Sequence, residues 1–591
     1  MPGANSSLGN RLGELLRLEK LPPPAGFSAR AEVTDPAAYE RVAADPPAWW
    51  AAQARERLHW DTPFCSVLDD GHPPFYTWFA DGTINASYNC LDRHVLAGRG
   101  GRVAFHWRGA HGEERDLTYA ELSRDVQRLA NALKAQGIRK GDIVGIYLPM
   151  IPETVVTMLA CARIGAPHAV VSGCAPGAVR ERLAASRAKA LIVADGVQRR
   201  GKLVPVKYQM DKVISDLPEL ETVVVVRSSG ADCLMRPGRD VWFDDLLASA
   251  RPLYPAEPME AEHPLFLLYP PSSAAGPAGV VHSTGGYLAG VTATTAMVFD
   301  LDADYDIFWC TAEAGRITGH SYVVYGPLAN GCTSVMFEGD QDYPDKDIWW
   351  EIVERYGVTI LHTATAAIRA CMRWGAKHPA KRDLSSLRLL GSAGEPADPE
   401  AWVWYHTVIG GERCPVVDSW CQPETGAIMI STPPGMPAKP GSAGRPLPGV
   451  SAAVLDGSGG EADQGGGVLA LTRPWPSMLR TLYREPDRYA RTYFGGSGPL
   501  TYISGDGARR DEDGYFWITG RAGKPSAARP GTSKPTLARD PASGQVPGNA
   551  TTLRDASLLS QPPQTSSPAS TGDGRAPRAR TQFNRQIREA T

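Results

Sequence analysis

The chain has 591 residues, 43% of them hydrophobic and 21% charged, and its formal net charge is −3. This size allows several cores, and the near-neutral charge provides neither a basic field for nucleic acid nor the acidic excess typical of disorder. The ten cysteines form no C-x-x-C pair, so no disulfide framework or zinc site is indicated, and free thiols fit a reducing compartment. No apolar run reaches the roughly 18 residues of a membrane span, and the polar start is unlike a secretory signal. We therefore expect a cytoplasmic protein that acts on small molecules, with no nucleic-acid or membrane partner.

The first 95 residues divide into two segments. Residues 1–35 are rich in Pro, Gly, Ala and Ser, and we expect them to be mostly disordered. Residues 36–95 gather aromatic side chains among prolines, including Trp49, Trp50 and Trp78. Because so much aromatic surface is unfavourable in water, this second segment is predicted to pack on the main body.

Between residues 96 and 521, short β-rich runs alternate with helical patterns. One helix is predicted over 119–136, where apolar residues recur at helical spacing and Gly137 follows as a stop. The runs predicted as strands are 142–148, 169–171, 190–194, 223–226, 265–269, 307–310, 334–337, 359–362, 387–390 and 416–417. This alternation predicts an α/β fold, a large domain of several subdomains with mainly parallel sheets covered by helices.

Unusual polar segments follow several of these strands. They are Thr311–Tyr322, Gly391–Pro396, Asp418–Gly426 and a predicted polar turn over Tyr502–Tyr515, after which a short strand, 517–521, ends on Arg521. Any one of them could be a turn with satisfied polar groups. Ligands of parallel α/β folds bind at the carboxyl ends of the strands, so the four together indicate a ligand site.

The stretch from Leu268 to Leu288 has a strand entering a loop of small residues, a pattern found in phosphate-binding loops. Such a loop uses backbone N–H groups and a cation. Here residues 270–279 contain three prolines, which lack N–H groups, and no lysine or arginine. Taken alone, the loop is better explained as a plain surface connection.

The longer motifs resemble those of the AMP-forming acyl-CoA synthetases in the adenylate-forming superfamily, and most closely the acetyl-CoA synthetases. The motifs that carry the resemblance are N-A-S-Y-N-C-L-D-R-H (85–94), W-C-T-A-E-A-G-R-I-T-G-H-S-Y (309–322), L-L-G-S-A-G-E-P (389–396), K-P-G-S-A-G-R-P-L-P-G (439–449) and G-D-G-A-R-R-D-E-D-G-Y-F-W-I-T-G-R (505–521). The resemblance implies a large adenylate-forming domain over 96–521. It also implies a ligase that uses ATP, Mg²⁺ and CoA and passes through acetyl-AMP.

The resemblance also implies which residues form each site. The ATP or AMP site would comprise Ser273, Gly279, Gly394, Glu395, Pro396, Asp418, Ser419, Trp420, Cys421, Gln422, Pro423, Asp506 and Arg521. The acyl pocket would comprise Ile317, Thr318, Ala393 and Cys421, and Glu424 would bind Mg²⁺. Arg199, Arg200 and Thr318 would bind CoA, although a solvated basic turn explains the two arginines equally well. These residue types suit their ligands, since carboxylates accept from ribose hydroxyls and arginine reaches phosphates.

Two groups of positions depart from the family pattern. Of the family's phosphate loop T-S-G-S-T-G-K-P-K-G, residues 270–279 keep only Ser273, Pro277 and Gly279, and both lysines are gone. Cys421 stands where the family has a tryptophan that closes the acyl pocket. A smaller residue there enlarges the pocket, so propionate or a longer short-chain acid is an alternative substrate.

The end of the sequence also departs from the family. Residues 522–591 are a low-complexity mixture of Pro, Ser, Ala, Thr, Gly and Arg, and we expect a disordered tail instead of the family's small C-terminal domain. The family's catalytic lysine has no counterpart, so the catalytic residue stays unknown and turnover is expected to be impaired or lost. The alternatives are a non-catalytic descendant that binds nucleotide or CoA, and a truncated remnant. The sequence does not indicate an oligomeric state.

Overall fold

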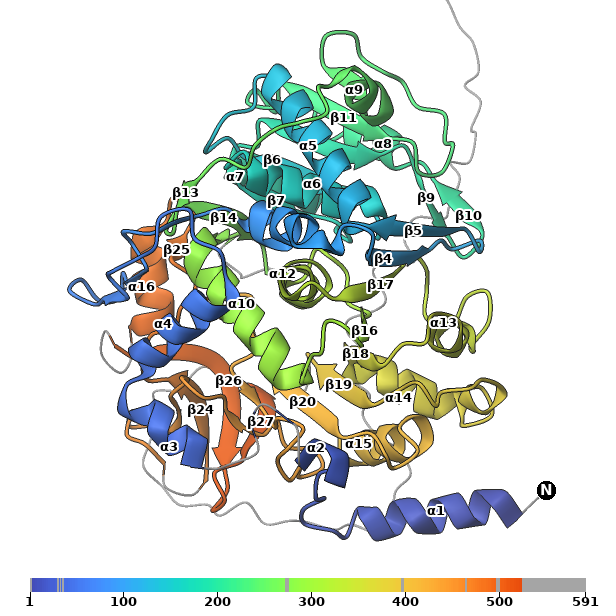
Figure 1. The fold of residues 1–591 in the computed structure, drawn as a ribbon, viewed down its shortest axis with the longest axis vertical. Helices are drawn as coiled ribbons and strands as arrows, with labels where there is room; N and C mark the ends of the chain where they lie inside the picture. The colour runs from blue at the N-terminus through green and yellow to red at the C-terminus, as the bar shows by residue number, and fades with distance from the viewer. Residues whose placement is uncertain are drawn as a thin grey trace, which may run out of the picture. The chain divides into compact units, whose positions relative to one another are not determined.

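The structure is a computed structural model that describes residues 3–28, 31, 33, 37–270, 276–394, 398–462, 465–495 and 500–522. Three of the predicted nucleotide-site residues, Ser273, Glu395 and Pro396, lie outside the described residues. The predicted tail also lies outside them from residue 523 onward. Within the described part, the chain forms two large sheets, a four-stranded sheet and three two-stranded sheets, with helices packed on the large ones (Figure 1).

The first large sheet has eight strands in the order β12-β11-β8-β6-β7-β14-β15-β25. Their bounds are β6 Val144–Tyr147, β7 His168–Val170, β8 Ala190–Ala194, β11 Thr222–Val226, β12 Asp240–Trp242, β14 Pro264–Leu268, β15 Val280–Ser283 and β25 Thr481–Leu482. Pairing is parallel from β12 to β14 and antiparallel beyond it. Helices α5 (Tyr119–Ala135), α6 (Pro152–Arg163) and α7 (Pro176–Ser186) alternate with these strands. A capping box between Thr118 and Glu121 begins α5, and Gly137, at φ 84°, follows its end.

The second large sheet has nine strands in the order β22-β21-β20-β19-β18-β16-β17-β4-β5. Their bounds are β4 Val103–Arg108, β5 Glu114–Thr118, β16 Ile307–Cys310, β17 Thr333–Phe337, β18 Ile360–Ala364, β19 Leu389–Ala393, β20 Val416–Trp420, β21 Ile430–Ser431 and β22 Arg445–Pro446. Neighbours are parallel from β4 to β20. The predicted α/β class with mainly parallel sheets is confirmed. However, β19 and β20 run three residues further than predicted, into the segments expected to be loops.

The third sheet corrects one prediction. It contains β23 (Ala452–Leu455), β24 (Gly465–Leu471), β26 (Tyr502–Arg510) and β27 (Phe516–Arg521), all antiparallel. Residues 502–515 were expected to form a polar turn, but 502–510 form β26 between two partner strands. The prediction was wrong because an antiparallel sheet satisfies the backbone of a glycine-rich, polar segment through neighbours distant in sequence.

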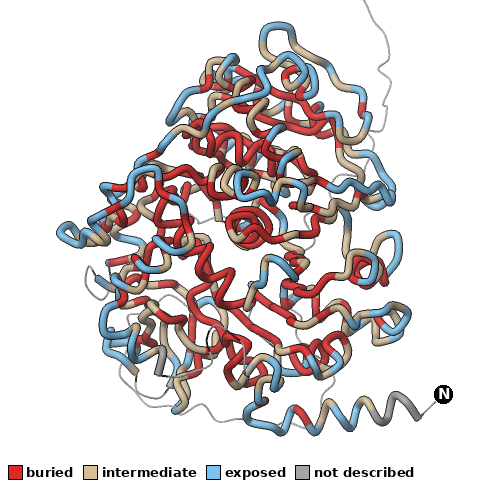
Figure 2. The backbone as a smooth tube through the Cα atoms, in the orientation of Figure 1, coloured by how far each residue is buried: buried red, intermediate tan, exposed pale blue. Residues whose placement is uncertain are grey.

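Helix α10 (Thr284–Phe299) lies at the centre of the main core, and each of its residues is buried. Figure 2 shows this helix as an unbroken red stretch. The same cluster of buried side chains includes Val144 and Ile192 from the first sheet and Phe308 and Leu389 from the second. The two sheets therefore share one core. No helix among the described residues has the length and apolar character needed to cross a membrane.

The N-terminal segment has more structure than its composition predicted. Helix α1 (Gly3–Leu15) packs on α15 (Pro399–Trp404), and Leu15 is buried there. Arg11 donates two hydrogen bonds, of 2.9 and 2.7 Å, to the Glu412 carboxylate. The expectation that residues 1–35 are mostly disordered is thus wrong for 3–28, because apolar side chains and an ion pair fix this part to the body.

The aromatic segment lies against the same core. Helix α4 (Pro46–Arg57) packs on α10, and Trp50, Trp78 and Phe79 are fully buried. The Trp50 indole N–H donates to the Gly449 carbonyl at 3.0 Å. This bond satisfies the polar atom of a ring that is otherwise surrounded by apolar groups.

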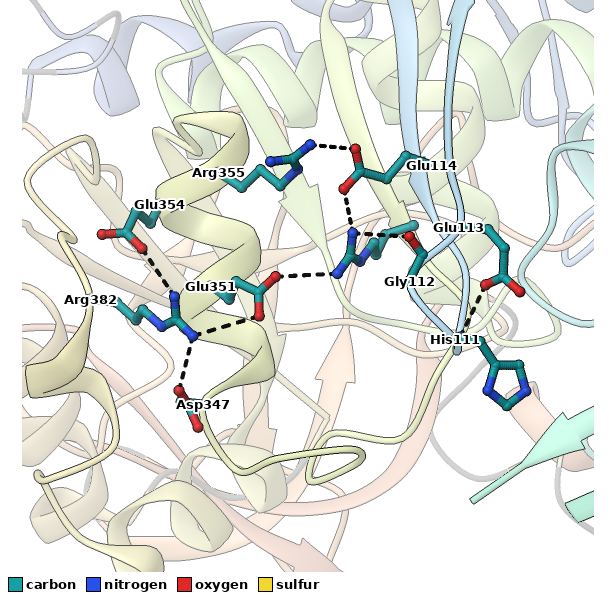
Figure 3. A network of polar contacts seen from close by, with 10 residues as sticks. His111, Gly112, Glu113, Glu114, Asp347, Glu351, Glu354, Arg355 and Arg382 are labelled. Carbon is teal, nitrogen blue, oxygen red and sulfur yellow. Dashed lines mark hydrogen bonds and ion pairs between the residues drawn. The ribbon is translucent and has the colours of Figure 1, made fainter. Parts of the chain in front are cut away.

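A charged network ties the edge of the second sheet to α13 (Ile348–Tyr356) (Figure 3). Its ion pairs join Arg108 to Glu114 and Glu351, Arg355 to Glu114, and Arg382 to Asp347, Glu351 and Glu354. The loop between β17 and α13 is therefore held at both ends, since β17 pairs with β4 and α13 carries the network.

Candidate functional site

Loops from the two large sheets meet at the carboxyl ends of their parallel strands. The Ala314 N–H, after β16, donates to the Met150 sulfur, after β6, at 3.2 Å. A Cβ atom built on Gly315 would lie 3.1 Å from the carbonyl oxygen of Ser172, which follows β7. These contacts bring together the loop ends where α/β folds bind ligands.

Asp506 contacts three other predicted site residues, Trp420, Gln422 and Arg521. Its Oδ2 accepts hydrogen bonds from Trp420 Nε1 at 3.0 Å and from Gln422 Nε2 at 2.7 Å. Its Oδ1 lies 3.3 Å from Nη1 of Arg521, whose side chain is 74% exposed. One carboxylate oxygen is thus fixed by the protein, whereas the other faces a solvated guanidinium. This arrangement can accept hydrogen bonds from vicinal hydroxyls.

Sheet register explains how Asp506 and Arg521 meet. They are directly opposite each other in the antiparallel pair β26–β27. Trp420 is the last residue of β20, in the second large sheet, and Gln422 lies in the loop that follows this strand. The Tyr502 hydroxyl donates to Gln422 Oε1 at 2.8 Å and so orients the amide that bonds to Asp506.

Glu424, the predicted magnesium ligand, is half-buried beside this group. The Tyr493 hydroxyl donates to its Oε1 at 2.8 Å. Burial raises the pKa of Glu424, while this hydrogen bond and the Arg521 charge act in the opposite direction. The backbone N–H of Glu424 also donates to this carboxylate and lowers its pKa. Within the described residues no cluster of three or more His, Cys, Asp or Glu could hold a metal ion. Glu424 therefore fits Mg²⁺ only as one protein carboxylate beside phosphate oxygens and water, which is a usual magnesium environment.

Asp418 and Ser419 have their side chains inside the second sheet. Ser392 Oγ donates to Asp418 Oδ1 at 2.6 Å, and Ser419 Oγ donates to the Ser392 carbonyl at 2.8 Å. Burial raises the pKa of Asp418 to about 7. Because β20 extends to Trp420, both predicted nucleotide residues occupy strand positions, and their side chains hold β19 to β20.

The structure brings two predicted acyl-pocket residues into contact. Burial raises the pKa of the Cys421 thiol to about 11, opposed by a hydrogen bond with the Thr318 side chain. Ile317, the first residue of the short helix α11 (Ile317–Gly319), is buried, as is Ala393 at the end of β19. Ala393 pairs with Ser419 across the β19–β20 ladder, two residues before Cys421.

The two predicted CoA arginines lie on a hairpin formed by β9 (Val197–Arg199) and β10 (Lys202–Val204). Both are exposed. Arg200 Nη2 lies 2.5 Å from Asp342 Oδ1, so this guanidinium has a carboxylate partner. Arg199 is the last residue of β9. Both arginines are far in sequence from Thr318, the third residue predicted to bind CoA.

The remaining predicted residues have backbone roles in the structure. Gly394 follows β19 at φ 99°, a conformation that favours glycine, and a Cβ there would meet open space. The Gly279 carbonyl accepts from the Tyr483 N–H at 2.7 Å. The Pro423 carbonyl lies 2.7 Å from His282 Nε2.

Sequence reasoning missed two aromatic residues of the site. Tyr493, on α16 (Pro486–Phe494), reaches Glu424, and Tyr502 reaches Gln422. Their rings stack with centroids 5.5 Å apart. The amphipathic pattern of residues 486–494 was the available signal, since it marks a helix packed on the body.

The fold and this site define an AMP-binding enzyme. Residues 92–480 match the family described as AMP-binding enzyme, and residues 36–90 match the family described as acetyl-coenzyme A synthetase N-terminus. The chain belongs to the AMP-binding enzyme family.

The chain is similar over most of its length to proteins named acetyl-coenzyme A synthetase. The chain is 54% identical over 503 residues to that of Rubrobacter xylanophilus, a match that covers 84% of this chain and 78% of the relative. It is 51% identical over 524 residues to that of Streptomyces avermitilis, covering 88% and 79%. It is also 51% identical over 510 residues to that of Gemmatimonas aurantiaca, covering 85% and 78%.

Proposed function

We propose that the chain is an AMP-forming acetate–CoA ligase. Acetate would attack the α-phosphorus of ATP, forming acetyl-AMP and releasing pyrophosphate, and the CoA thiolate would then attack the acetyl carbon and release AMP. The observation that carries the proposal is the identity of 51–54% to relatives named acetyl-coenzyme A synthetase over 84–88% of this chain.

We propose a role in this reaction for each group of residues. Asp506 Oδ1 and Arg521 would bind the ribose hydroxyls of the nucleotide, with Trp420 and Gln422 fixing the carboxylate. Gly394 and the neighbouring Glu395 and Pro396 would lie along the adenine. Glu424 would hold Mg²⁺, which supplies positive charge to the phosphate oxygens when bound. Gly279 and Ser273 would belong to the phosphate loop.

The acyl end is proposed to lie at Thr318, Ile317, Ala393 and Cys421. Cys421 and Thr318 are adjacent, and a thiol fills much less space than a large aromatic ring. We therefore propose that propionate, and less readily butyrate, compete with acetate. Thr318, Arg199 and Arg200 would contact CoA, which is expected to enter where the loops of the two sheets meet.

A second candidate function is binding of nucleotide or CoA without turnover. The observation that favours it is the composition of residues 270–279, which contain no lysine or arginine. A single preorganised donor to developing charge is worth about 3–4 kcal/mol in such sites, so losing several would slow adenylate formation by orders of magnitude. Under either candidate the substrates are small molecules, and the unpaired thiols suit a cytoplasmic location.

The experiment that separates the candidates is ATP–pyrophosphate exchange with acetate, propionate and butyrate, combined with calorimetric titration of AMP. Exchange that depends on the carboxylate supports the ligase. Binding of AMP without exchange supports the non-catalytic alternative. A chain that neither exchanges nor binds would contradict both, and circular dichroism of the same sample would show whether it is folded.

A further inference from the structure

Arg200 occupies an unusual backbone position at the tip of the β9–β10 hairpin. Arg200 and Gly201 both have positive φ, of 48° and 72°. A two-residue hairpin turn with positive φ at both positions normally has Asn or Asp followed by Gly. This conformation is unfavourable for an L-residue with a side chain as long as that of arginine. An arginine therefore occupies a turn position at which a small polar residue is usual.

The side chain of Arg200 reaches two carboxylates in the loop that follows β17 of the second large sheet. Its Nη2 lies 2.5 Å from Asp342 Oδ1, and its Nε lies 3.6 Å from Asp340 Oδ2. A Cβ on Gly201 would come within 2.7 Å of the Tyr343 hydroxyl, so the hairpin tip approaches this loop closely. Both acids belong to the loop between β17 and α13, whose ends are fixed by β4 and by the charged network of Figure 3.

The contact between Arg200 and the two aspartates lies at the carboxyl ends of strands from the two large sheets. The hairpin follows β8 of the first sheet, and the acidic loop follows β17 of the second. Arg200 is 58% exposed, and Asp342 is 26% exposed. The guanidinium has five N–H donors, so it can serve a second anion, but that anion would lie within a few ångströms of both carboxylates.

We infer that Asp342 and Asp340 compete with the phosphate of CoA for the Arg200 guanidinium and thereby set the affinity of the chain for CoA. The inference rests on the proposed function for the identity of the ligand. What it adds is a pair of acidic residues, on a different sheet from the arginine, that weaken binding of the nucleotide end of CoA.

The test measures binding of adenosine 3′,5′-bisphosphate, and of CoA, to the full chain by calorimetry. The variants are Asp342→Asn and the double variant Asp340→Asn/Asp342→Asn. Asp304→Asn serves as a matched control, because Asp304 also pairs with surface arginines, at 3.0 and 3.3 Å from Arg102 and Arg99. Exposed ion pairs are worth about 0.2–1 kcal/mol, so the double variant is expected to bind about two- to fivefold tighter at low salt.

Two further readouts isolate the competition. The gain in affinity is expected to shrink at high salt, since salt screens the carboxylates. In an Arg200→Ala background the acid substitutions are expected to have no effect on binding. Asp304→Asn is expected to bind as the wild type does.

Unchanged or weaker binding in the double variant would overturn the inference, and weaker binding would mean that the acids hold Arg200 in a productive position. Failure of every variant to bind the bisphosphate would overturn it as well. Acetate-dependent ATP–pyrophosphate exchange needs no CoA, so it reports on the proposed ligase independently of this outcome.

Discussion

Replacing Asp506 by asparagine is predicted to weaken nucleotide binding while the fold is kept. In the structure both protein donors, Trp420 Nε1 and Gln422 Nε2, bond to Oδ2, at 3.0 and 2.7 Å. An asparagine carbonyl can take the place of Oδ2 and keep both bonds. Its amide group then replaces Oδ1, so the acceptor that faces Arg521 and the ribose is lost together with the charge.

The magnitude follows from the bonds that change. Each hydrogen bond to a charged group is worth about 1.5–3 kcal/mol, so loss of the Oδ1 acceptor should weaken AMP binding by about tenfold to a hundredfold. The two retained bonds become neutral and the pair with exposed Arg521 is lost, so the free energy of unfolding should fall by only about 1 kcal/mol. Asp506→Ala, in contrast, leaves the buried Trp420 N–H without its acceptor and should cost about 2–4 kcal/mol.

Calorimetric titration with AMP and urea unfolding of the same samples provide the measurements. Asp216→Asn is the control, because Asp216 is an exposed aspartate paired with Arg180 on the surface. If Asp506→Asn binds AMP as tightly as the wild type, Asp506 does not hold the ribose and this reading of the site fails. If Asp506→Asn unfolds as readily as Asp506→Ala, the hydrogen-bond geometry described above is wrong.

Three further predictions address the acyl pocket, a buried lysine and the core histidines. Cys421→Trp should abolish exchange with butyrate and reduce it with propionate relative to acetate, because the ring would fill space beside Thr318; an unchanged preference among the three acids would contradict this placement. Lys439 Nζ lies 2.9 Å from a carboxylate oxygen of Asp511 and 2.6 Å from one of Asp513. Lys439→Met should therefore lower the free energy of unfolding, measured by urea titration, by about 3 kcal/mol. A loss no larger than that caused by Asp216→Asn would refute this prediction. Burial lowers the pKa of His320 and His362 to about 4 each. Unfolded histidine titrates near 6.5, so the unfolded chain binds more protons below that pH, and each residue should cost about 2 kcal/mol of stability at pH 5. Urea midpoints at pH 8, 6.5 and 5 should therefore fall in that order, and a constant midpoint would show that these rings are not buried neutral.

The local sequence pattern was sufficient to predict the boundaries of strands that are buried on both faces. The predicted strands 190–194 and 307–310 coincide with β8 and β16, because continuous apolar runs of that length leave little choice of boundary. The same reasoning failed over 502–510, where glycine and charged residues form a strand through pairing with β24, whose residues pair from Gly465↔Arg510 to Leu471↔Tyr502 and so lie far from β26 in the chain. Such pairing cannot be read from a window of a few residues.

The contacts that the predicted site residues make could not be predicted from the sequence. The Asp506–Arg521 pair depends on the register of β26 and β27, which no spacing in the sequence fixes. Asp418 was expected at the nucleotide, but because β20 extends past it, its carboxylate bonds to Ser392 inside the sheet. The Asp342 partner of Arg200 lies 142 residues away in the chain, and only the tertiary structure brings the two together.

The shared core has a consequence for how this sequence can vary. Trp50 and Trp78, from the segment matched to one family, pack in the same cluster as α10, from the segment matched to the other. The buried Asn85 side chain joins the two segments, because its amide donates to the carbonyls of Ala162 and Arg163 at 3.2 and 3.1 Å. The boundary near residue 91 thus separates the two family matches, but it does not separate two units that fold independently. A chimera of this chain and a relative is expected to fold only when the contacting residues on both sides of that boundary come from the same protein.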